Sequence, residues 1–170
     1  FSGTNTWFWG FDSTLGSTNG VTSGSKALYT YNGNYPTYMG GPYWATSPVM
    51  NCGGCSGGWD LKFQKRLGVE SSSYDHAYVS VKNNAGNWVN VWSNSGTVND
   101  GSYTTQTITI SNYVAANSNF QVRFGLGSSD GSVQYTGWNV DDVEILPKAS
   151  GVSTGEGNWT SQPFGPGAGT

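Results

Sequence analysis

Hydrophobic and polar residues alternate along most of the chain with a period of two, which is typical of β-strands. The clearest example is WDLKFQKRL at residues 59–67. There Leu61, Phe63 and Leu67 fall on one face, and charged and amide side chains fall on the other. No segment of convincing length has the period of an α-helix. The pattern therefore predicts an all-β chain.

Two neighbouring segments predict a β-hairpin. In YDHAYVSVK, at residues 74–82, Ala77, Val79 and Val81 share a face with Asp75, and four side chains take the other face: His76, Tyr78, Ser80 and Lys82. The turn signal NNAG leads directly into NWVNVW at residues 87–92. Its two valines are expected to face inward, which predicts that three side chains point outward: Trp88, Asn90 and Trp92.

The remaining strands are predicted from shorter runs bounded by turn signals. They lie at 6–11, 27–31, 46–51, 103–110, 119–126 and 137–146. About eight strands with aligned alternation predict a two-sheet antiparallel β-sandwich, or jelly roll. We expect one sandwich domain over residues 1–146. The Gly-, Ser- and Pro-rich residues 147–170 are expected to be a C-terminal extension or a linker remnant.

Composition narrows the class of protein. The chain has 170 residues, enough for one domain with a full core, and only 10% of them are charged, against about 25% in typical domains. The net charge is −3 and the basic residues are scattered, which argues against nucleic-acid binding. No apolar run approaches the roughly 18 residues of a membrane span. We interpret the Ser-, Thr- and Asn-rich composition as that of a secreted domain, trimmed of its signal segment or excised from a longer chain.

The order of four segments resembles a known family. TSPVM, YDHAYVSVKNNAGNWVNVW, NFQVRFGLGSSD and GWNVDDVEI follow one another as in secreted bacterial MAM-like and cleaved-adhesin-like jelly-roll modules. The most specific part is the Gly-Trp-x-x-Asp-Asp-Val run at 137–143. The resemblance covers residues 1–146. It implies a non-catalytic sandwich, often with bound calcium, that serves adhesion or carbohydrate binding beside an extracellular peptidase or hydrolase. The CGGC at 52–55 has no counterpart in that pattern.

Two adjacent aspartates, Asp141 and Asp142, interrupt the apolar run of the last predicted strand. A carboxylate that faces a core is costly unless it is paired or coordinated, and calcium takes six to eight oxygen ligands. We predict one calcium ion bound by one or both aspartates together with Asp12, because first and last strands of a sandwich commonly lie together. Asp75 is a weaker candidate. The alternative is a bulge with one aspartate solvated and the other paired with Arg123.

The two cysteines admit three interpretations. A zinc site needs four ligands, and the chain offers Cys52, Cys55 and a single histidine. Thioredoxin-like chemistry needs the motif at a helix start in a βαβ unit, which the all-β pattern excludes. A disulfide between the two cysteines, bracing a glycine-rich turn in an oxidising compartment, is the favoured interpretation.

Aromatic residues are the strongest signal of a ligand. They make up 15% of the chain, and an aromatic ring exposed beside polar groups suits the C–H face and the hydroxyl edges of a sugar. The predicted polysaccharide platform consists of Trp88, Trp92 and Tyr78 with Asn90 and Arg123. The alternative platform is the Tyr-rich loop at 31–44, with Tyr38, Tyr43 and Trp44.

Catalysis is not expected. The usual glycosidase chemistry needs two carboxyl groups flanking the scissile bond, and the three glutamates form no spaced pair. The lone His76 has no nucleophile motif near it. The leading hypothesis is a secreted, calcium-stabilised carbohydrate-binding module that targets an attached hydrolase to polysaccharide. The alternatives are an accessory C-terminal domain of a secreted peptidase that binds protein substrate, and a stand-alone β-sandwich glycoside hydrolase or lyase.

Overall fold

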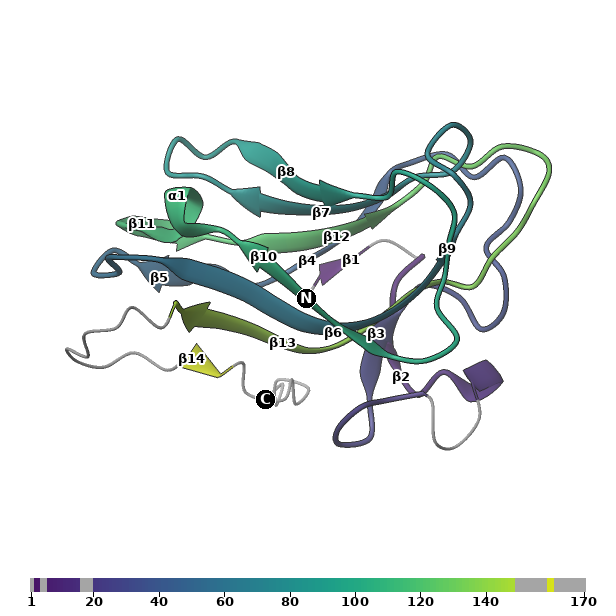
Figure 1. Cartoon of the computed structure of the whole chain (residues 1–170), viewed down its shortest axis with the longest axis horizontal. Coiled ribbons are helices and arrows are strands. Elements are labelled where there is room, and N and C mark those ends of the chain that lie inside the picture. Colours follow the sequence, from purple (N-terminus) through teal and green to yellow (C-terminus); the bar gives the residue numbers. More distant parts are fainter. Residues whose placement is uncertain (1, 4–5, 16–19, 149–158, 161–170) are drawn as a thin grey trace, which may run out of the picture.

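Two antiparallel sheets form the two layers of the protein (Figure 1). The computed structural model describes residues 2–3, 6–15, 20–148 and 159–160. Every strand pair in these ranges is antiparallel, and helical structure is limited to two short turns, η1 (Ser13–Leu15) and α1 (Ser111–Val114). The predicted all-β, two-sheet fold class is confirmed.

The first sheet has five strands, and its outer face carries the candidate site. Its order is β1 (Ser2–Gly3), β4 (Tyr43–Thr46), β12 (Val122–Leu126), β7 (Ala77–Lys82) and β8 (Trp88–Ser93). Only β7 and β8 are neighbours in both sequence and space, joined by the predicted hairpin turn. The other pairings bring together segments that lie far apart in the chain.

The second sheet has seven strands. Its main path is β10 (Thr104–Thr109), β6 (Trp59–Val69), β13 (Gly137–Pro147), β3 (Ala27–Tyr29) and β2 (Phe8–Gly10); β9 (Val98–Asn99) pairs with β6, and β14 (Trp159–Thr160) pairs with β13. A separate two-stranded sheet joins β5 (Met50–Cys52) to β11 (Asn117–Phe120). No helix in the described ranges is long and apolar enough to cross a membrane.

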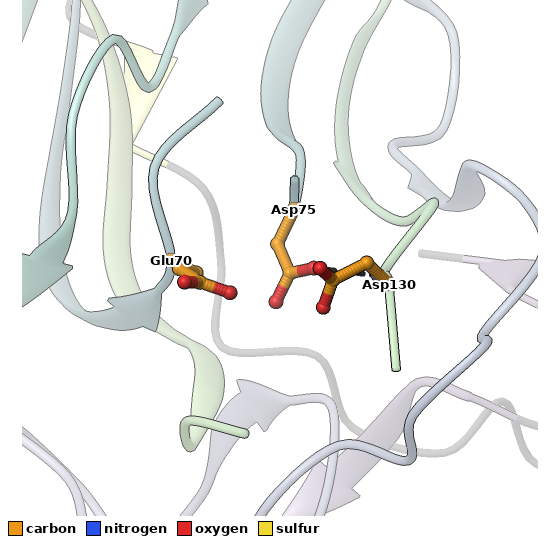
Figure 2. A group of neighbouring side chains, drawn as sticks. All are labelled: Glu70, Asp75 and Asp130. Atoms are coloured by element: carbon orange, nitrogen blue, oxygen red, sulfur yellow. Dashed lines mark hydrogen bonds between the residues drawn. The ribbon is translucent and has the colours of Figure 1, made fainter. Parts of the chain in front are cut away.

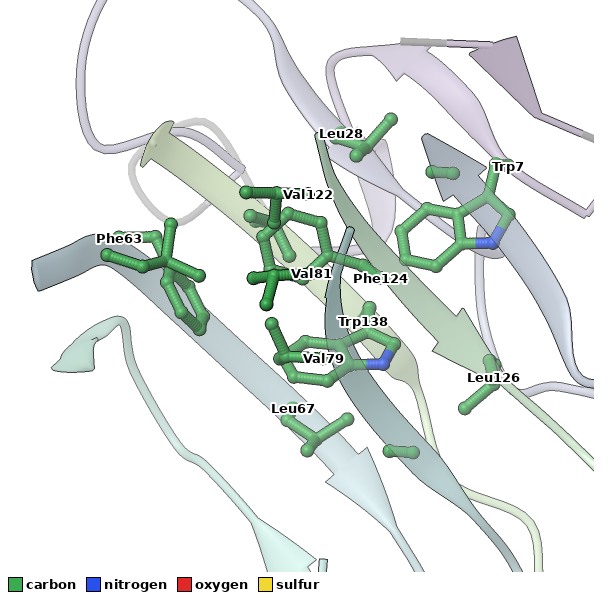
Figure 3. Packing of buried hydrophobic residues seen from close by; sticks show 14 of the residues in the cluster. Trp7, Leu28, Phe63, Leu67, Val79, Val81, Val122, Phe124, Leu126 and Trp138 are labelled. Carbon is green, nitrogen blue, oxygen red and sulfur yellow. The ribbon is translucent and has the colours of Figure 1, made fainter. Parts of the chain in front are cut away.

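The core lies between the two main sheets (Figure 3). Leu61, Phe63 and Leu67 of β6 are all buried, as their alternation predicts. The Phe124 ring of β12 meets the Phe63 ring edge-on at 5.1 Å. Apolar side chains from both inner faces thus interdigitate, as in other sandwiches.

Some strand boundaries differ from the predicted ones. The predicted strand at 46–51 is instead the end of β4, a break, and the start of β5. Pro48 lies in the break, and proline has no N–H to donate to a sheet. The first half of β4, Tyr43 and Trp44, therefore falls within the segment predicted as the Tyr-rich loop, so that Trp44 is a strand residue.

A β-bulge changes the direction of Trp92. Val81 pairs with Val89, but Val79 pairs with Trp92, so β8 has one residue more than β7 over this stretch. An extra residue reverses which side chains face the core. Trp92 consequently points inward and packs edge-on against Trp138, with 5.6 Å between the ring centroids. The prediction that Trp92 points outward is wrong.

The predicted extension at 147–170 lies mostly outside the described residues. Pro147 closes β13, and the Lys148 N–H donates to the Gly58 carbonyl at 2.8 Å. Farther on, Trp159 pairs with Ile145 as part of β14. A domain boundary after residue 146 stays a prediction.

The predicted Cys52–Cys55 disulfide is wrong for this structure, in which both cysteines are free. The Cys55 N–H donates to the Cys52 carbonyl at 2.9 Å, so a backbone hydrogen bond closes the turn without a covalent link. Cys52 ends β5 and its side chain belongs to the core. Burial, reinforced by a hydrogen bond with Cys55, raises the pKa of the Cys52 thiol to about 12.

Free thiols have a measurable consequence. Under non-reducing conditions iodoacetamide should label both cysteines of the unfolded protein, whereas Cys52 of the folded protein should react slowly, because the thiolate is the reactive form and burial disfavours it. Mass spectrometry of the labelled chain measures both results. An unfolded, unreduced chain that accepts no label would contradict the free-thiol assignment.

Candidate functional site

Four aromatic rings, those of Trp44, His76, Tyr78 and Trp88, gather on the outer face of the five-stranded sheet. Trp44 and Tyr78 lie on either side of Gly125, which pairs with both of them. A Cβ atom at Gly125 would come within 2.5 Å of the Trp44 ring, so only glycine lets that ring lie down across β12. The Trp44 and Tyr78 ring centroids are 5.9 Å apart, and His76 stacks on Tyr78 at the same separation.

Arg123 holds the aromatic residues together. Its guanidinium carbon lies 3.7 Å from the centroid of the Trp44 ring and 4.2 Å from that of the Trp88 ring. A cation between two indole faces is attracted by both ring quadrupoles. Burial lowers the pKa of the Arg123 guanidinium from its ordinary value, yet arginine remains protonated at neutral pH. We call this group of side chains the aromatic face: Trp44, His76, Tyr78, Trp88 and Arg123.

Polar groups border the aromatic face. Ser80, which pairs with Arg123 across the sheet, donates its hydroxyl to the Asn90 side-chain oxygen at 2.5 Å. Lys82, which pairs with Trp88, donates to the Gln121 side-chain oxygen at 3.3 Å. Asn90 is exposed. Amide and ammonium groups therefore stand beside the rings, where the edge of a bound molecule would reach them.

Of the residues predicted for the alternative platform, only Trp44 lies beside those of the first platform. Trp88, Tyr78, Asn90 and Arg123 lie together as predicted, whereas Trp92 is partly buried and packs against the core. Tyr43 is partly buried against the core. Tyr38 is 82% exposed, and its ring lies against Gly131, outside the five-stranded sheet.

Asp141 and Asp142 are held by donors from a distant loop. One Asp141 oxygen accepts the Thr22 N–H and hydroxyl, both at 2.8 Å, and the Ser23 N–H at 3.2 Å. Asp142 accepts the hydroxyls of the same two residues at 2.9 and 2.5 Å. The register of β13 against β6 shifts between Asp141 and Glu144, and Asp142 has φ of 47°. The bulge of the alternative interpretation is therefore present, but Arg123 lies on the other sheet.

Asp12 is buried near this pair. Its two oxygens accept from the Thr14 N–H at 3.0 Å, the Thr14 hydroxyl at 2.6 Å and the Asn139 side-chain amide at 3.1 Å. The other side-chain atom of Asn139, its Oδ1, is buried and accepts no hydrogen bond from the described residues. Asp12, Asp141 and Asp142 all act electrostatically on Tyr103, whose pKa is raised mainly by burial. The structure thus brings the predicted residues into one region. Whether they bind calcium stays a prediction.

A second acidic group, Glu70, Asp75 and Asp130, converges more tightly (Figure 2). One carboxylate oxygen from each residue lies within 4.8 Å of the other two, the only such trio among the described residues. Asp75 is fully buried and accepts the Tyr35 hydroxyl and the Asp130 N–H. Glu70 Oε2 is buried without a donor from the described chain. Burial and then the two neighbouring carboxylates raise the pKa of Glu70.

The trio joins two loops at one end of the sandwich, at residues 70–76 and 127–136. Asn94 donates its side-chain amide to the carbonyls of Glu70, at 2.8 Å, and Asp75, at 3.0 Å. The Asp130 carbonyl accepts the Tyr38 N–H at 2.8 Å. Asp75 directly precedes His76 of the aromatic face. These three carboxylates can hold a metal ion. Only Asp75 is among the ligands predicted from the sequence, because Glu70 and Asp130 lie in loops whose meeting no local pattern reveals.

Comparisons with known proteins place the fold. No family model matches the chain, and no curated protein matches it in sequence. Among solved structures, the K1 cleaved adhesin domain of Lys-gingipain from Porphyromonas gingivalis has a TM-score of 0.50 at 15% identity, over 84% of each chain. This likeness confirms, for the fold, the predicted resemblance to cleaved-adhesin-like jelly-roll modules.

Two carbohydrate-binding domains resemble this chain less than the adhesin domain does. A family 61 carbohydrate-binding module in complex with β-1,4-galactotriose has a TM-score of 0.47 at 14% identity, over 84% of this chain and 88% of its own. The N-terminal cellulose-binding domain of β-1,4-glucanase C from Cellulomonas fimi has a TM-score of 0.45 at 15% identity, over 88% and 97%.

Proposed function

We propose that the protein is a non-catalytic carbohydrate-binding module and that the aromatic face is its binding surface. The observation that carries this proposal is the Trp44–Arg123–Trp88 arrangement. Two large rings are held in fixed positions on a sheet, with the polar groups of Asn90 and Lys82 beside them. Sugar rings stack their C–H faces on such aromatic side chains, and grouped apolar surface on a soluble domain commonly marks a binding site.

The absence of carboxylates from this surface supports binding without catalysis. The strands β4, β7, β8 and β12 contain no aspartate or glutamate. Glycoside hydrolysis in its usual form needs two carboxyl groups across the scissile bond. A sugar on the aromatic face would therefore meet stacking and hydrogen-bonding groups, with no pair of carboxyl groups from these four strands.

We further propose that the domain is secreted and directs an attached hydrolase to polysaccharide. The adhesin-like jelly-roll fold and the low share of charged residues support this proposal. An attached peptidase, with the domain binding protein substrate, is the alternative.

Affinity electrophoresis through gels that contain a soluble polysaccharide tests the binding proposal. Polymers with different backbones should be used, together with gelatin as a protein ligand. We expect retardation by at least one polysaccharide and none by gelatin. Retardation by gelatin alone would overturn glycan binding and favour the peptidase accessory function.

We propose that one calcium ion binds the Glu70–Asp75–Asp130 trio. Three carboxylates crowded together repel one another unless a cation compensates, and oxygen ligands suit calcium. Two observations support this position over the Asp12–Asp141–Asp142 group: the three carboxylates converge within 4.8 Å, and Glu70 Oε2 has no donor from the described chain. Hydroxyl and amide donors bind carboxylates in both groups. A cation at the trio would link the loops that carry Tyr38 and His76.

Removing calcium should lower stability. A ligand that binds only the folded state stabilises it by about 2.7 kcal/mol at a hundredfold excess over Kd. We expect the melting temperature to fall with EDTA and to recover with calcium. Glu70→Gln should abolish this response. Because it also relieves repulsion among the carboxylates, the calcium-free variant should be at least as stable as the calcium-free unaltered protein.

Asp141→Asn is the matched control at the other acidic group. It should retain the calcium response. If Asp141→Asn abolishes the response and Glu70→Gln does not, the ion binds at the residues first predicted from the sequence. A melting temperature unchanged by EDTA, with no calcium by elemental analysis, would contradict both positions.

A further inference from the structure

The cations of the two main sheets differ in their partners. Ion pairs among the described residues involve three lysines of the seven-stranded sheet and its border: Lys62 with Glu144 at 3.2 Å, Lys65 with Asp100 at 2.6 Å, and Lys148 with Asp60 at 3.7 Å. Each of these three positive charges is offset within the protein, whereas Arg66 of β6 donates its Nε–H to the Asp100 carbonyl and has a buried Nη1 without an acceptor among the described residues. The two cations of the five-stranded sheet, Arg123 and Lys82, form no ion pair with any described residue.

Arg123 is the more unusual of the two. Its guanidinium carries five N–H groups, yet its only recorded partners within the described chain are the rings of Trp44 and Trp88. Its Nε is buried without an acceptor. The guanidinium is thus held in one orientation by two indoles, and no described residue accepts a hydrogen bond from it. A guanidinium that is already fixed in orientation loses little further freedom when it binds an acceptor of a ligand, so binding there would be favourable.

The surroundings of Arg123 favour a negatively charged acceptor. The four strands that carry the aromatic face contain no acidic residue, and Asp75, the acidic residue next to His76, is completely buried. Lys82 stands opposite Trp88 and adds a second positive charge. Although the whole chain has a net charge of −3, salt screens charges beyond about 8 Å. A ligand on this face therefore experiences mainly Arg123 and Lys82.

We propose that the aromatic face selects acidic polysaccharides, with the carboxylate of a uronic acid residue bound by Arg123 and its sugar ring stacked on Trp44 or Trp88. This inference rests on the proposed glycan-binding function and adds the class of glycan. The planar guanidinium fork matches a carboxylate with two parallel hydrogen bonds, and such charge-assisted bonds are about twice as strong as neutral ones. Partial burial strengthens them further, because the surroundings are less polar than water.

The test compares each acidic polymer with its own carboxyl-reduced form. Polygalacturonate, alginate and glucuronoxylan are titrated against the protein alongside their reduced, neutral counterparts, with dextran sulfate as a polyanion that lacks carboxylates. We expect at least one acidic polymer to bind about tenfold or more tightly than its reduced form, with a preference that weakens as salt increases.

Single substitutions then test which side chain causes the preference for acidic over neutral polymers. Arg123→Gln should reduce the ratio of acidic to neutral affinity to near one, and Arg123→Lys should restore only part of it, because lysine keeps the charge but loses the fork. Lys26→Gln is the matched control: it makes the same change in net charge at an exposed position outside the aromatic face, and it should leave the ratio unchanged. Melting curves accompany each variant.

The outcomes separate this inference from the proposed function. Equal or tighter binding of every reduced polymer by the unaltered protein would overturn the acidic preference while glycan binding stands. Dextran sulfate bound as tightly as the uronate polymers would overturn carboxylate recognition. Failure to bind any polymer would overturn glycan binding and the inference together. The comparison with the unaltered protein needs no variant, so a poorly folded Arg123→Gln protein would not prevent the test.

Discussion

Replacing Trp138 with alanine is expected to destabilise the protein by about 3–5 kcal/mol, the usual cost of removing a large core aromatic side chain. Trp138 is 0% exposed and lies between the two sheets (Figure 3). Its ring contacts those of Trp92 and Phe124 edge-on, and its Nε1 donates to the Gly125 carbonyl at 2.9 Å. Urea unfolding monitored by circular dichroism measures the change.

Trp88→Ala is the matched control for this prediction. It removes the same side chain from the outer face, where water can fill the space, so it should cost much less stability. Similar losses for Trp138→Ala and Trp88→Ala would mean that the assignment of core and surface is wrong.

Replacing Trp44 with alanine is expected to reduce glycan affinity by about thirtyfold or more, which corresponds to the 2 kcal/mol or more that central aromatic residues of an interface commonly contribute. The melting temperature should change little, because the ring lies on the sheet rather than between the sheets. The loss has two causes. The stacking surface disappears, and Arg123 loses one of the two rings that orient it. Affinity electrophoresis with the polysaccharide that retards the unaltered protein measures the effect.

Tyr38→Ala separates the aromatic face from the alternative platform. Tyr38 is highly exposed and lies off the five-stranded sheet, so its removal should leave affinity within a few-fold of that of the unaltered protein. A large loss with Tyr38→Ala and none with Trp44→Ala would assign binding to the loop.

Prediction from the sequence succeeded where a property depends on near neighbours. The inward direction of Phe63 and Val79 follows from strand alternation, which each strand imposes on its own side chains. The Asp141–Asp142 bulge was left open as an alternative, because two polar residues within an apolar run disturb the alternation locally. The predicted outward direction of Trp92 was wrong for a related reason. The bulge that turns it inward consists of one extra residue, and nothing in NWVNVW marks where that residue is.

The candidate site was only partly predictable. Tyr78, Trp88 and Asn90 could be grouped because a short turn joins their strands. Trp44 was assigned to a different platform, since its place beside Arg123 depends on the pairing of β4 with β12. Gly125, a glycine within a strand, was a usable signal of close approach, but it could not reveal which ring lies over it.

The sequence by itself determined the all-β class, the faces of most strands and the hairpin that presents Tyr78 and Trp88, because period-two alternation and turn chemistry act over a few residues. Only the tertiary structure decided that Arg123 lies between Trp44 and Trp88, that Glu70 and Asp130 join Asp75, and that no disulfide joins Cys52 and Cys55. The Arg123 arrangement depends on strand pairing over long separations in the chain, as does the approach of Asp130 to Asp75. The other contacts depend on how short loops and turns close against the rest of the fold. Many strand orders satisfy the same local alternation, so packing of the whole core is needed to select one.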